Sequence, residues 1–276
     1  MAIHRSGSPD RSVERQQAHF DGIAEDYFAA RRNTNHLLLK ELMWRDFLGG
    51  RNELRREGLR VLEAMCGFAD GKDIVEGALG VKVHYAGFDY SNAVVAKLRA
   101  TRPELDIRQA DVTSYVAHET YDLVVLLGGL HHVHHAAAEA VKRVSRAVEP
   151  GGYLLNLEPT NGNPLFRRVR ERIYRRNALF DAATERAFEV TELFGLFEAA
   201  GLRRVDAAWP GLLSYVLYYN PDAFPRLNLG GSWAVRLAFA LDRPFFRTAF
   251  GRIMSFATLS LWQRPAALAG ETGAAP

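Results

Sequence analysis

The chain has 276 residues, of which 48% are hydrophobic and 24% charged. This length suits one large domain, or one domain with a modest cap, and the composition excludes disorder as the main state. The formal net charge of +3 is too small to indicate a nucleic-acid partner. The one cysteine, Cys66, cannot form an internal disulfide, and the polar N-terminus does not resemble a secretory signal. We therefore expect a cytoplasmic protein.

The first part of the chain predicts a short arm followed by helices. Residues 1–12 are polar, and apolar residues then recur at helical spacing over Val13–Ala30 and His36–Leu48. We expect residues 1–12 to be a flexible arm and residues 13–58 to form an N-terminal helical cap.

Short apolar runs then alternate with helical ones, which predicts a parallel sheet with helices on both faces. The run from Leu123 to Leu127 is continuously apolar and indicates a central strand. The prediction is a doubly wound, Rossmann-like α/β domain over residues 59–264 with a seven-stranded, mostly parallel sheet. Its expected strands are Arg60–Ala64, Val83–Asp89, Asp106–Gln109, Tyr121–Leu127, Gly152–Leu157, Leu202–Ala208 and Phe256–Trp262.

Two segments of this domain look like insertions that cover a substrate. Residues 161–183 are polar and rich in arginine, and Thr184–Ala200 then predicts a helix closed by Gly201. Residues 209–255 are rich in aromatic and aliphatic side chains and are too long for an ordinary connection. The tail, residues 265–276, is expected to be flexible. Charged residues interrupt every long apolar run, so we expect no membrane span.

A turn with few glycines follows the first strand, from Glu63 to Gly71. In a doubly wound sheet such a turn lets the backbone approach a ligand at the carboxyl end of the strands. By itself it is a weak signal, and an ordinary strand-to-helix turn is the alternative. Asp89 ends the next strand, about 20 residues on, where an acidic side chain accepts hydrogen bonds from ribose hydroxyls. These two features also fit a nicotinamide cofactor.

Three further motifs follow in order: Ala110-Asp111-Val112 after the third strand, the strand that begins Tyr121-Asp122-Leu123, and Glu149-Pro150-Gly151-Gly152 before the fifth strand. Leu130-His131-His132-Val133 follows the fourth strand. This order, over about half of the chain, resembles the class I S-adenosylmethionine-dependent methyltransferases, and among them the small-molecule group that includes quinone-biosynthesis C-methyltransferases.

The resemblance implies S-adenosylmethionine as the cofactor. Glu63 would lie near its amino-acid end, Asp89 would bind the ribose and Asp111 the adenine amine, with the segment after Leu127 beside the methyl donor. The residues expected to bind the cofactor are Glu63, Cys66, Gly67, Asp89, Tyr90, Asp111, Val112 and Leu127. Met65 and Ala69 stand where the family usually has glycine, so a shifted cofactor pose is one expectation.

The candidate catalytic residues are His131, His132, Glu158 and Tyr27. A histidine is able to act as general base near neutral pH, although a structural or helix-capping role is the commoner alternative. Adjacent histidines point apart, so no metal is expected. Glu158 either orients an acceptor or caps a turn, and Tyr27 matches a family tyrosine over the active site or packs on the core.

Arg167, Arg168, Tyr215 and Tyr219 are the candidate substrate-binding residues. Arginines match phosphate or carboxylate oxygens, with a solvated helix face as the alternative. The aromatic segment favours a hydrophobic acceptor, such as an isoprenoid, a polyketide or a quinone-like compound. A homo-oligomer is compatible with the sequence.

Two competing functions remain at this point. One is a protein that binds lipids or a membrane surface on an inactive methyltransferase scaffold, because glycines are missing from the first turn and the late segment is basic and aromatic. The other is an NAD-linked oxidoreductase, which leaves Asp111 and the Pro-Gly-Gly motif unexplained.

Overall fold

The computed structural model describes residues 32–174, 186–219, 221 and 226–266. The helix expected over residues 13–30, with the candidate Tyr27, lies outside the described residues.

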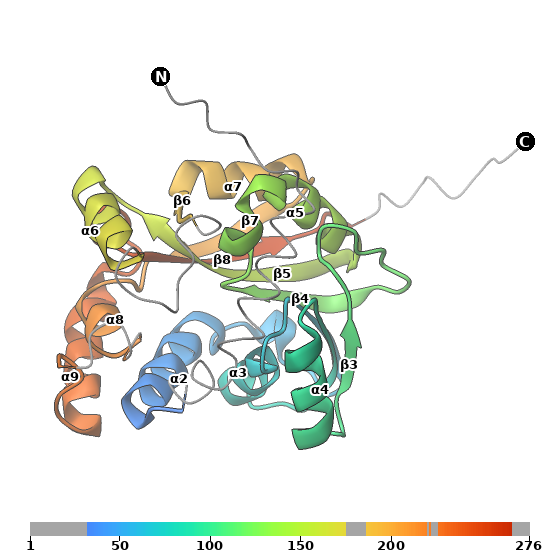
Figure 1. Cartoon of the computed structure of the whole chain (residues 1–276), viewed down its shortest axis with the longest axis horizontal. Helices are drawn as coiled ribbons and strands as arrows, with labels where there is room; N and C mark the ends of the chain where they lie inside the picture. The colour runs from blue at the N-terminus through green and yellow to red at the C-terminus, as the bar shows by residue number, and fades with distance from the viewer. Residues whose placement is uncertain (1–31, 175–185, 220, 222–225, 267–276) are drawn as a thin grey trace, which may run out of the picture.

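A twisted sheet runs through the molecule between layers of helices (Figure 1). Seven strands follow one another in the order β3-β2-β1-β4-β5-β8-β7, and all neighbours are parallel except that β8 runs antiparallel to β5 and to β7. This confirms the predicted doubly wound, mostly parallel sheet, and a two-residue eighth strand, β6, pairs with β5. The strands are β1 (Leu59–Ala64), β2 (Val83–Asp89), β3 (Asp106–Gln109), β4 (Tyr121–Leu127), β5 (Val148–Asn161), β6 (Phe188–Glu189), β7 (Arg203–Ala208) and β8 (Ala257–Gln263).

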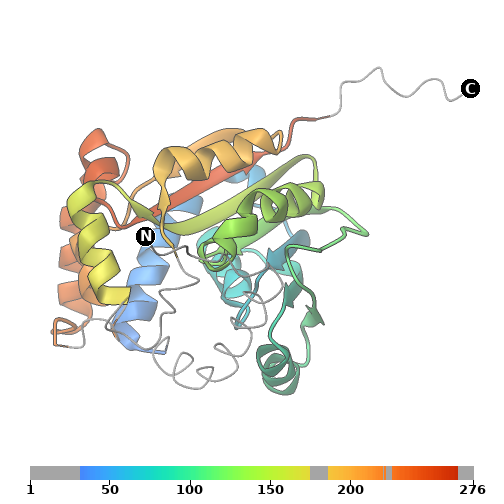
Figure 2. The same cartoon turned by 45° about the horizontal axis from the view of Figure 1, so that its top comes forward.

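Helices cover both faces of the sheet (Figures 1 and 2). The helices with their short 3-10 neighbours are α2 (Thr34–Leu48), η1 (Asn52–Leu54), α3 (Asp70–Leu79), α4 (Asn92–Thr101), η2 (Leu130–Ala136), α5 (Ala137–Arg146), α6 (Pro164–Tyr174), α7 (Val190–Ala199), α8 (Leu213–Tyr218), α9 (Ser232–Asp242), η3 (Arg243–Phe245) and α10 (Ala249–Met254).

The central strand β4 is buried on both faces, as its apolar run predicts. Leu123 and Val125 belong to a core with α2, α3, α8 and α9. Val124 and Leu126, pointing the other way, belong to a core with α5 and α7. Successive side chains of a strand point to opposite faces of the sheet, so an unbroken apolar run packs against the helices on both faces.

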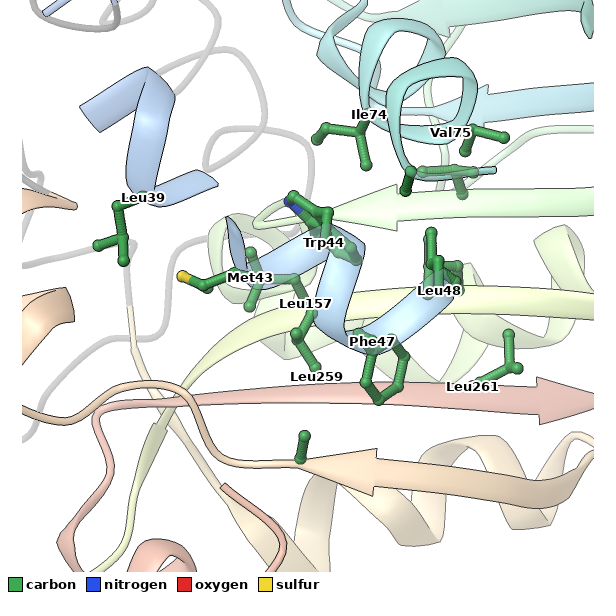
Figure 3. Packing of buried hydrophobic residues seen from close by; sticks show 14 of the residues in the cluster. Leu39, Met43, Trp44, Phe47, Leu48, Ile74, Val75, Leu157, Leu259 and Leu261 are labelled. Carbon is green, nitrogen blue, oxygen red and sulfur yellow. The ribbon is translucent and has the colours of Figure 1, made fainter. Parts of the chain in front are cut away.

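Helix α2 is the main cover of the first face. Asn33 caps it by accepting hydrogen bonds from the backbone N–H groups of Asn35 and His36 at 3.0 and 3.3 Å. Its buried face includes Met43, Trp44 and Phe47. Figure 3 shows these side chains beside Leu157 of β5 and two leucines of β8. The helix therefore supports the antiparallel side of the sheet.

Both ends of β5 and the start of α7 were predicted wrongly by four residues or more; β5 ends at Asn161 rather than at Leu157. β5 begins at Val148 rather than Gly152, because Pro150-Gly151-Gly152 forms a bulge: pairing with β4 moves from Tyr121↔Val148 to Leu123↔Tyr153. Gly151 has φ +85°, which favours glycine. The helix expected from Thr184 begins at Val190, and β6 precedes it. Gly201 does take the left-handed conformation, at φ +82°.

The arginine-rich segment contains helix α6, which agrees with the solvated helix face given above as the alternative to anion binding. Asn163 accepts a hydrogen bond from the Phe166 N–H at 2.9 Å, which caps α6. Arg170 of this helix is buried, donates to the carbonyls of Thr160 and Phe256, and lies over the Phe256 ring. One member of the arginine run is therefore structural.

Chain topology places α6 and the segment from α8 to α10 at one edge of the sheet. β5 is parallel to β1 and β4, and its carboxyl end leads into α6. β7 ends and β8 begins at this same edge, since Pro159 pairs with Ala257 and Ala208 with Leu259. Ligands of doubly wound sheets bind at the carboxyl edge.

None of the described helices has the length and apolar character that crossing a membrane requires.

We predict that Trp44→Ala lowers the free energy of unfolding by about 3–5 kcal/mol, because Trp44 is buried to 1% exposure and its removal leaves a large cavity. Leu37→Ala, on the exposed face of the same helix, is the control and is expected to cost less than about 1 kcal/mol. Urea unfolding followed by circular dichroism measures both, and equal losses would contradict this role of α2.

Candidate functional site at the carboxyl edge of the sheet

The turn after β1 takes a left-handed backbone at three positions. Met65, Gly67 and Ala69 have φ values of 55°, 50° and 61°. Two of these are not glycine, although L-residues pay a steric cost in this region. The expected departure at Met65 and Ala69 therefore changes the side chains but not the left-handed fold of the turn.

Glu63, near the carboxyl end of β1, holds this turn by accepting hydrogen bonds from it. Both of its carboxylate oxygens lie 3.0 Å from the Gly71 N–H, and the Tyr85 hydroxyl donates to Oε2 at 2.5 Å. Burial raises the pKa of Glu63 to about 8, although the bond from Tyr85 acts the other way. A Cβ on Gly71 would lie 2.6 Å from the Glu63 carboxyl carbon, so only glycine fits there.

Asp89 ties the turn to the end of β2. Its carboxylate accepts from the Gly67 N–H and from the Ser91 N–H, both at 3.0 Å. Burial raises the pKa of Asp89, while these backbone hydrogen bonds lower it. Each carboxylate oxygen accepts more than one hydrogen bond, so Asp89 retains capacity for ribose hydroxyls.

The turn leaves room for a ligand in front of Gly67. A Cβ built on Gly67 would meet no atom within 4 Å, although its backbone is held by Asp89. The geometry therefore combines a fixed backbone with open space, which is what close approach of a cofactor needs. The residues present fit an adenosyl cofactor by this test.

The other predicted cofactor residues lie on the same edge. Asp111 follows β3 and accepts from the backbone N–H and the hydroxyl of Thr113, at 2.8 and 2.9 Å, which orients its carboxylate. Val112 is buried, whereas Tyr90 and Leu127 are half-buried. Cys66 is a buried free thiol, and burial raises its pKa, so it is an inert part of the turn.

A buried carboxylate also organises the loop after β4. Glu158 of β5 is fully buried and accepts from the N–H groups of Gly129, Leu130 and His131, at 3.0, 2.8 and 3.3 Å. The His131 ring nitrogen Nδ1 lies 2.9 Å from Glu158 Oε2. Burial raises the pKa of Glu158 to about 7, with the backbone hydrogen bonds opposing it. Glu158 and His131 thus form a buried acid–base pair.

His132 joins this pair to the cofactor end of the site. Its ring lies 3.9 Å from the His131 ring, measured between centroids. Burial raises the pKa of Asp89 and of Glu158, and a positive charge on His132 would oppose this rise at both carboxylates, so the ring lies near both. The structure thus brings three predicted residues, His131, His132 and Glu158, to the edge that carries Asp89.

Met65 reaches across from the first turn toward the loop after β4. A Cβ built on Gly129 would lie 2.7 Å from Met65 Sδ. The Met65 side chain therefore fits only because position 129 is glycine, and it narrows the space between the two loops.

The predicted substrate residues fall in two different environments. Arg167 and Arg168 are exposed on α6. Tyr215 is buried and stacks on Tyr219 with ring centroids 4.3 Å apart, and the Tyr219 carbonyl lies 2.6 Å from His36 Nδ1 of α2. The tyrosines therefore help to hold α8 against α2. Across the described part of the chain, no three Cys, His, Asp or Glu residues cluster as metal ligands would.

Comparison with known proteins agrees with this geometry. A family model described as a methyltransferase domain matches residues 61–152, which run from β1 through the Pro-Gly-Gly motif. Residues 61–152 therefore have the sequence pattern of a methyltransferase domain. This match agrees with the expected class I fold and with S-adenosylmethionine as the expected cofactor.

Relatives of the methyltransferase domain cover much of the chain. A probable S-adenosylmethionine-dependent methyltransferase of Mycolicibacterium smegmatis is 30% identical over 165 residues, 57% of this chain and 62% of that protein. The chain therefore spans less than two thirds of this relative. A demethylmenaquinone methyltransferase of Bacillus cereus is 25% identical over 173 residues, covering 55% of this chain and 73% of that protein. A Thermotoga maritima SAM-dependent methyltransferase structure shares the fold, with TM-score 0.57 and 14% identity over 90% of this chain and 99% of that one.

The sequence did not predict three residues that shape the candidate site. Tyr85 lies in the middle of β2 and gives no pattern that connects it to Glu63. Ser91 caps α4 through a 3.2 Å bond from the Val94 N–H, and its place before the helix was an available signal. Gly129 was not distinguished from other loop glycines.

We predict that Ala69→Gly leaves the domain as stable as the wild type or raises the free energy of unfolding by up to about 1 kcal/mol. Relief of about 1–2 kcal/mol of left-handed strain outweighs the loss of one buried methyl group, about 0.8 kcal/mol. Ala96→Gly, at an exposed position inside α4, is the matched control and is expected to cost about 1 kcal/mol. Chemical denaturation compares them, and an equal loss in both variants would show that the turn is unstrained.

Proposed function

We propose that this protein is an S-adenosylmethionine-dependent methyltransferase that acts on a hydrophobic small molecule. One observation carries the proposal: the Gly67 turn held by Asp89 and the buried His131–Glu158 pair lie at the same edge of the sheet. The first suits a cofactor and the second suits an acceptor that must lose a proton. The methyltransferase relatives support the same reaction.

The cofactor, when bound, supplies an electrophilic methyl group on a sulfonium. The protein's own part is to hold donor and acceptor in line, since alignment and closeness account for much of the rate of such a displacement. Asp89 and the backbone at Gly67 fix the ribose and amino-acid ends. The loop after Leu127 positions the acceptor beside them.

His131 is the candidate base for an acceptor with an acidic hydroxyl or carbon. Its Nδ1 interacts with Glu158, which fixes the orientation of the ring and stabilises the imidazolium that forms when Nε2 takes a proton. His132 lies against the same ring and is the alternative contact to the acceptor. Tyr27, outside the described residues, stays a candidate on the resemblance alone.

A hydrophobic acceptor is supported by the elements that surround this edge. The segment from α8 to α10 and helix α6 are placed there by the topology of β5, β7 and β8. We infer that residues 161–183 and 209–255 form the cover of the acceptor site. The Bacillus relatives named as demethylmenaquinone methyltransferases favour a quinone-like acceptor, and an isoprenoid or polyketide has the same apolar character. Arg167 and Arg168 would bind an anionic group on it.

We predict that the intact protein binds S-adenosylmethionine in calorimetric titration and that Asp89→Asn weakens binding at least about tenfold, because a charged acceptor of hydrogen bonds is lost. Asp106→Asn, at the exposed opposite end of β3, is the control and is expected to bind like the wild type. Absence of binding by the wild type well above micromolar concentration would refute the methyltransferase function and leave the alternative, a lipid-binding protein on an inactive scaffold.

We also predict that methyl transfer to an acceptor with an ionisable group, such as a naphthoquinol, slows as the pH falls through about 7. The raised pKa means that Glu158 is a carboxylate above about 7 and becomes protonated below it, so support for the His131 imidazolium is lost on the acid side.

Glu158→Gln and His131→Asn are each expected to lower kcat by about 100-fold or more with little change in the KM for S-adenosylmethionine. His135→Asn, at an exposed position of the same 3-10 helix, is the control. Initial rates with methyl-labelled cofactor across pH measure this. An unchanged acid limb in Glu158→Gln would show that another group is the base.

A further inference from the structure

The outer surface of α9 is apolar although it faces solvent. Trp233, Leu237 and Leu241 follow one another at a spacing of four residues, and Trp233 is 69% exposed. The opposite side of the helix, with Val235 and Phe239, is buried in the core. Apart from Arg236, α9 thus has large apolar side chains on its outward as well as its inward side, which is typical of a helix with apolar surroundings on both sides.

Neighbouring elements extend this surface. The outer apolar surface, as named here, consists of exposed side chains of α6, α8, α9, η3 and α10 and of the connection before α9: Leu165, Val169, Leu213, Leu227, Leu229, Trp233, Leu237, Leu241, Phe245, Phe250 and Ile253. Figures 1 and 2 place α6, α8 and α9 at the same end of the molecule. These residues account for most of the exposed large apolar side chains among the described residues.

Direct contacts show that the elements form one body. Asn163, at the start of α6, donates to the Ile253 carbonyl of α10 at 2.8 Å. The Phe245 and Phe250 rings lie 5.2 Å apart, and Phe166 stacks on Phe256 at 4.4 Å. η3 continues directly from α9. The surface therefore has a fixed shape rather than being a set of separate side chains.

The charges around the outer apolar surface are almost all positive. Besides Arg167 and Arg168, which are assigned to the acceptor above, exposed arginines are present in α6, α9 and α10 and before α9: Arg172, Arg226, Arg236 and Arg252. Among the described residues of 162–174 and 209–256, Glu171 is the exposed carboxylate, and the other acidic side chain, Asp242, is buried. Such a surface complements an anionic one.

Two further arginines, although exposed, also bind the fold beneath the surface. Arg243 and Arg247 both bond to Asp46 of α2, at 2.5 and 3.1 Å. Together with the packing of α8 against α2, these ion pairs give the surface a rigid support.

We propose that the outer apolar surface binds the interface of a membrane that contains anionic lipids. Exposed leucine and phenylalanine side chains with a tryptophan enter the boundary between headgroups and acyl chains, while the arginines contact lipid phosphates. A second copy of the chain fits less well, because a two-fold contact of this surface with itself would bring arginines against arginines.

The position of the outer apolar surface connects membrane binding to the candidate site. It lies on the outside of the same elements that the topology puts at the carboxyl edge, where the candidate site is. A protein held to the lipid by these elements meets membrane-dissolved apolar molecules beside its site. Membrane binding itself is independent of the proposed methyl transfer, and either can fail without the other.

The test is co-sedimentation of the full chain with vesicles of phosphatidylcholine mixed with phosphatidylglycerol, against vesicles of phosphatidylcholine alone. We expect binding to the anionic vesicles that weakens at high salt. The double variant Trp233→Ala/Leu237→Ala is expected to reduce the partition coefficient at least about tenfold. Arg236→Glu/Arg252→Glu is expected to reduce it more than about fivefold.

Matched controls keep the result specific. Val116→Ala removes an exposed apolar side chain on the connection after β3, and Lys142→Glu reverses an exposed charge on α5. Both are expected to bind as the wild type does, and circular dichroism verifies that every variant is folded. Absent binding, or equal binding by all variants, would overturn the proposal.

Two measurements detect the other occupants of the surface. Sedimentation velocity that finds a dimer, lost in Trp233→Ala/Leu237→Ala, would make the surface a contact between copies and overturn membrane binding. The Trp233 emission, taken as the difference between the wild type and Trp233→Phe, should be quenched by acrylamide in the free protein and protected on vesicles. Protection already in the free monomer would mean that another segment of this chain covers the surface.

Discussion

The carboxyl edge of the sheet depends on buried carboxylates that hold backbone N–H groups. Where parallel strands end, the chain turns and its N–H groups lose their partners in the sheet, and a buried N–H without an acceptor is costly. Asp89 supplies the acceptor for Gly67 and Ser91, and Glu158 supplies it for the loop after β4. Each carboxylate fixes a loop that belongs to another strand.

This arrangement connects stability to chemistry. Burial raises the pKa of Glu63, Asp89 and Glu158, because a charged carboxylate loses its hydration inside the protein. The groups that build the loops are thereby also groups with altered proton affinity, and perturbed titrating groups gather where ligands react. Glu158 is the clearest case, since it both builds the η2 loop and contacts His131.

The outer elements are joined to the sheet by contacts of a different kind. α6 and the segment from α8 to α10 are joined to the sheet by the Arg170 contacts and by the ion pairs to Asp46, so their inner faces are ordered by the core. Their outer faces keep large apolar side chains and arginines exposed. One set of helices thus has an inward face packed on the core and an outward face on which the proposed membrane contact rests.

The sequence by itself determined the sheet and the positions of the site motifs. Apolar runs such as Leu123–Leu127 are local patterns, so strands β2, β3 and β4 were predicted with their observed bounds. Asp89 was placed at the end of β2 and Asp111 just after β3, whereas Glu158 lies within β5, which continues to Asn161. Only the tertiary structure decided which groups pair across the edge: Glu63 with Tyr85 and Gly71, Glu158 with His131, and Met65 with the space over Gly129. It also decided that Met65 and Ala69 keep a glycine-like backbone and that one side of α9 stays uncovered. These contacts form between residues that are distant in the chain, and a local sequence pattern does not predict which distant residues meet.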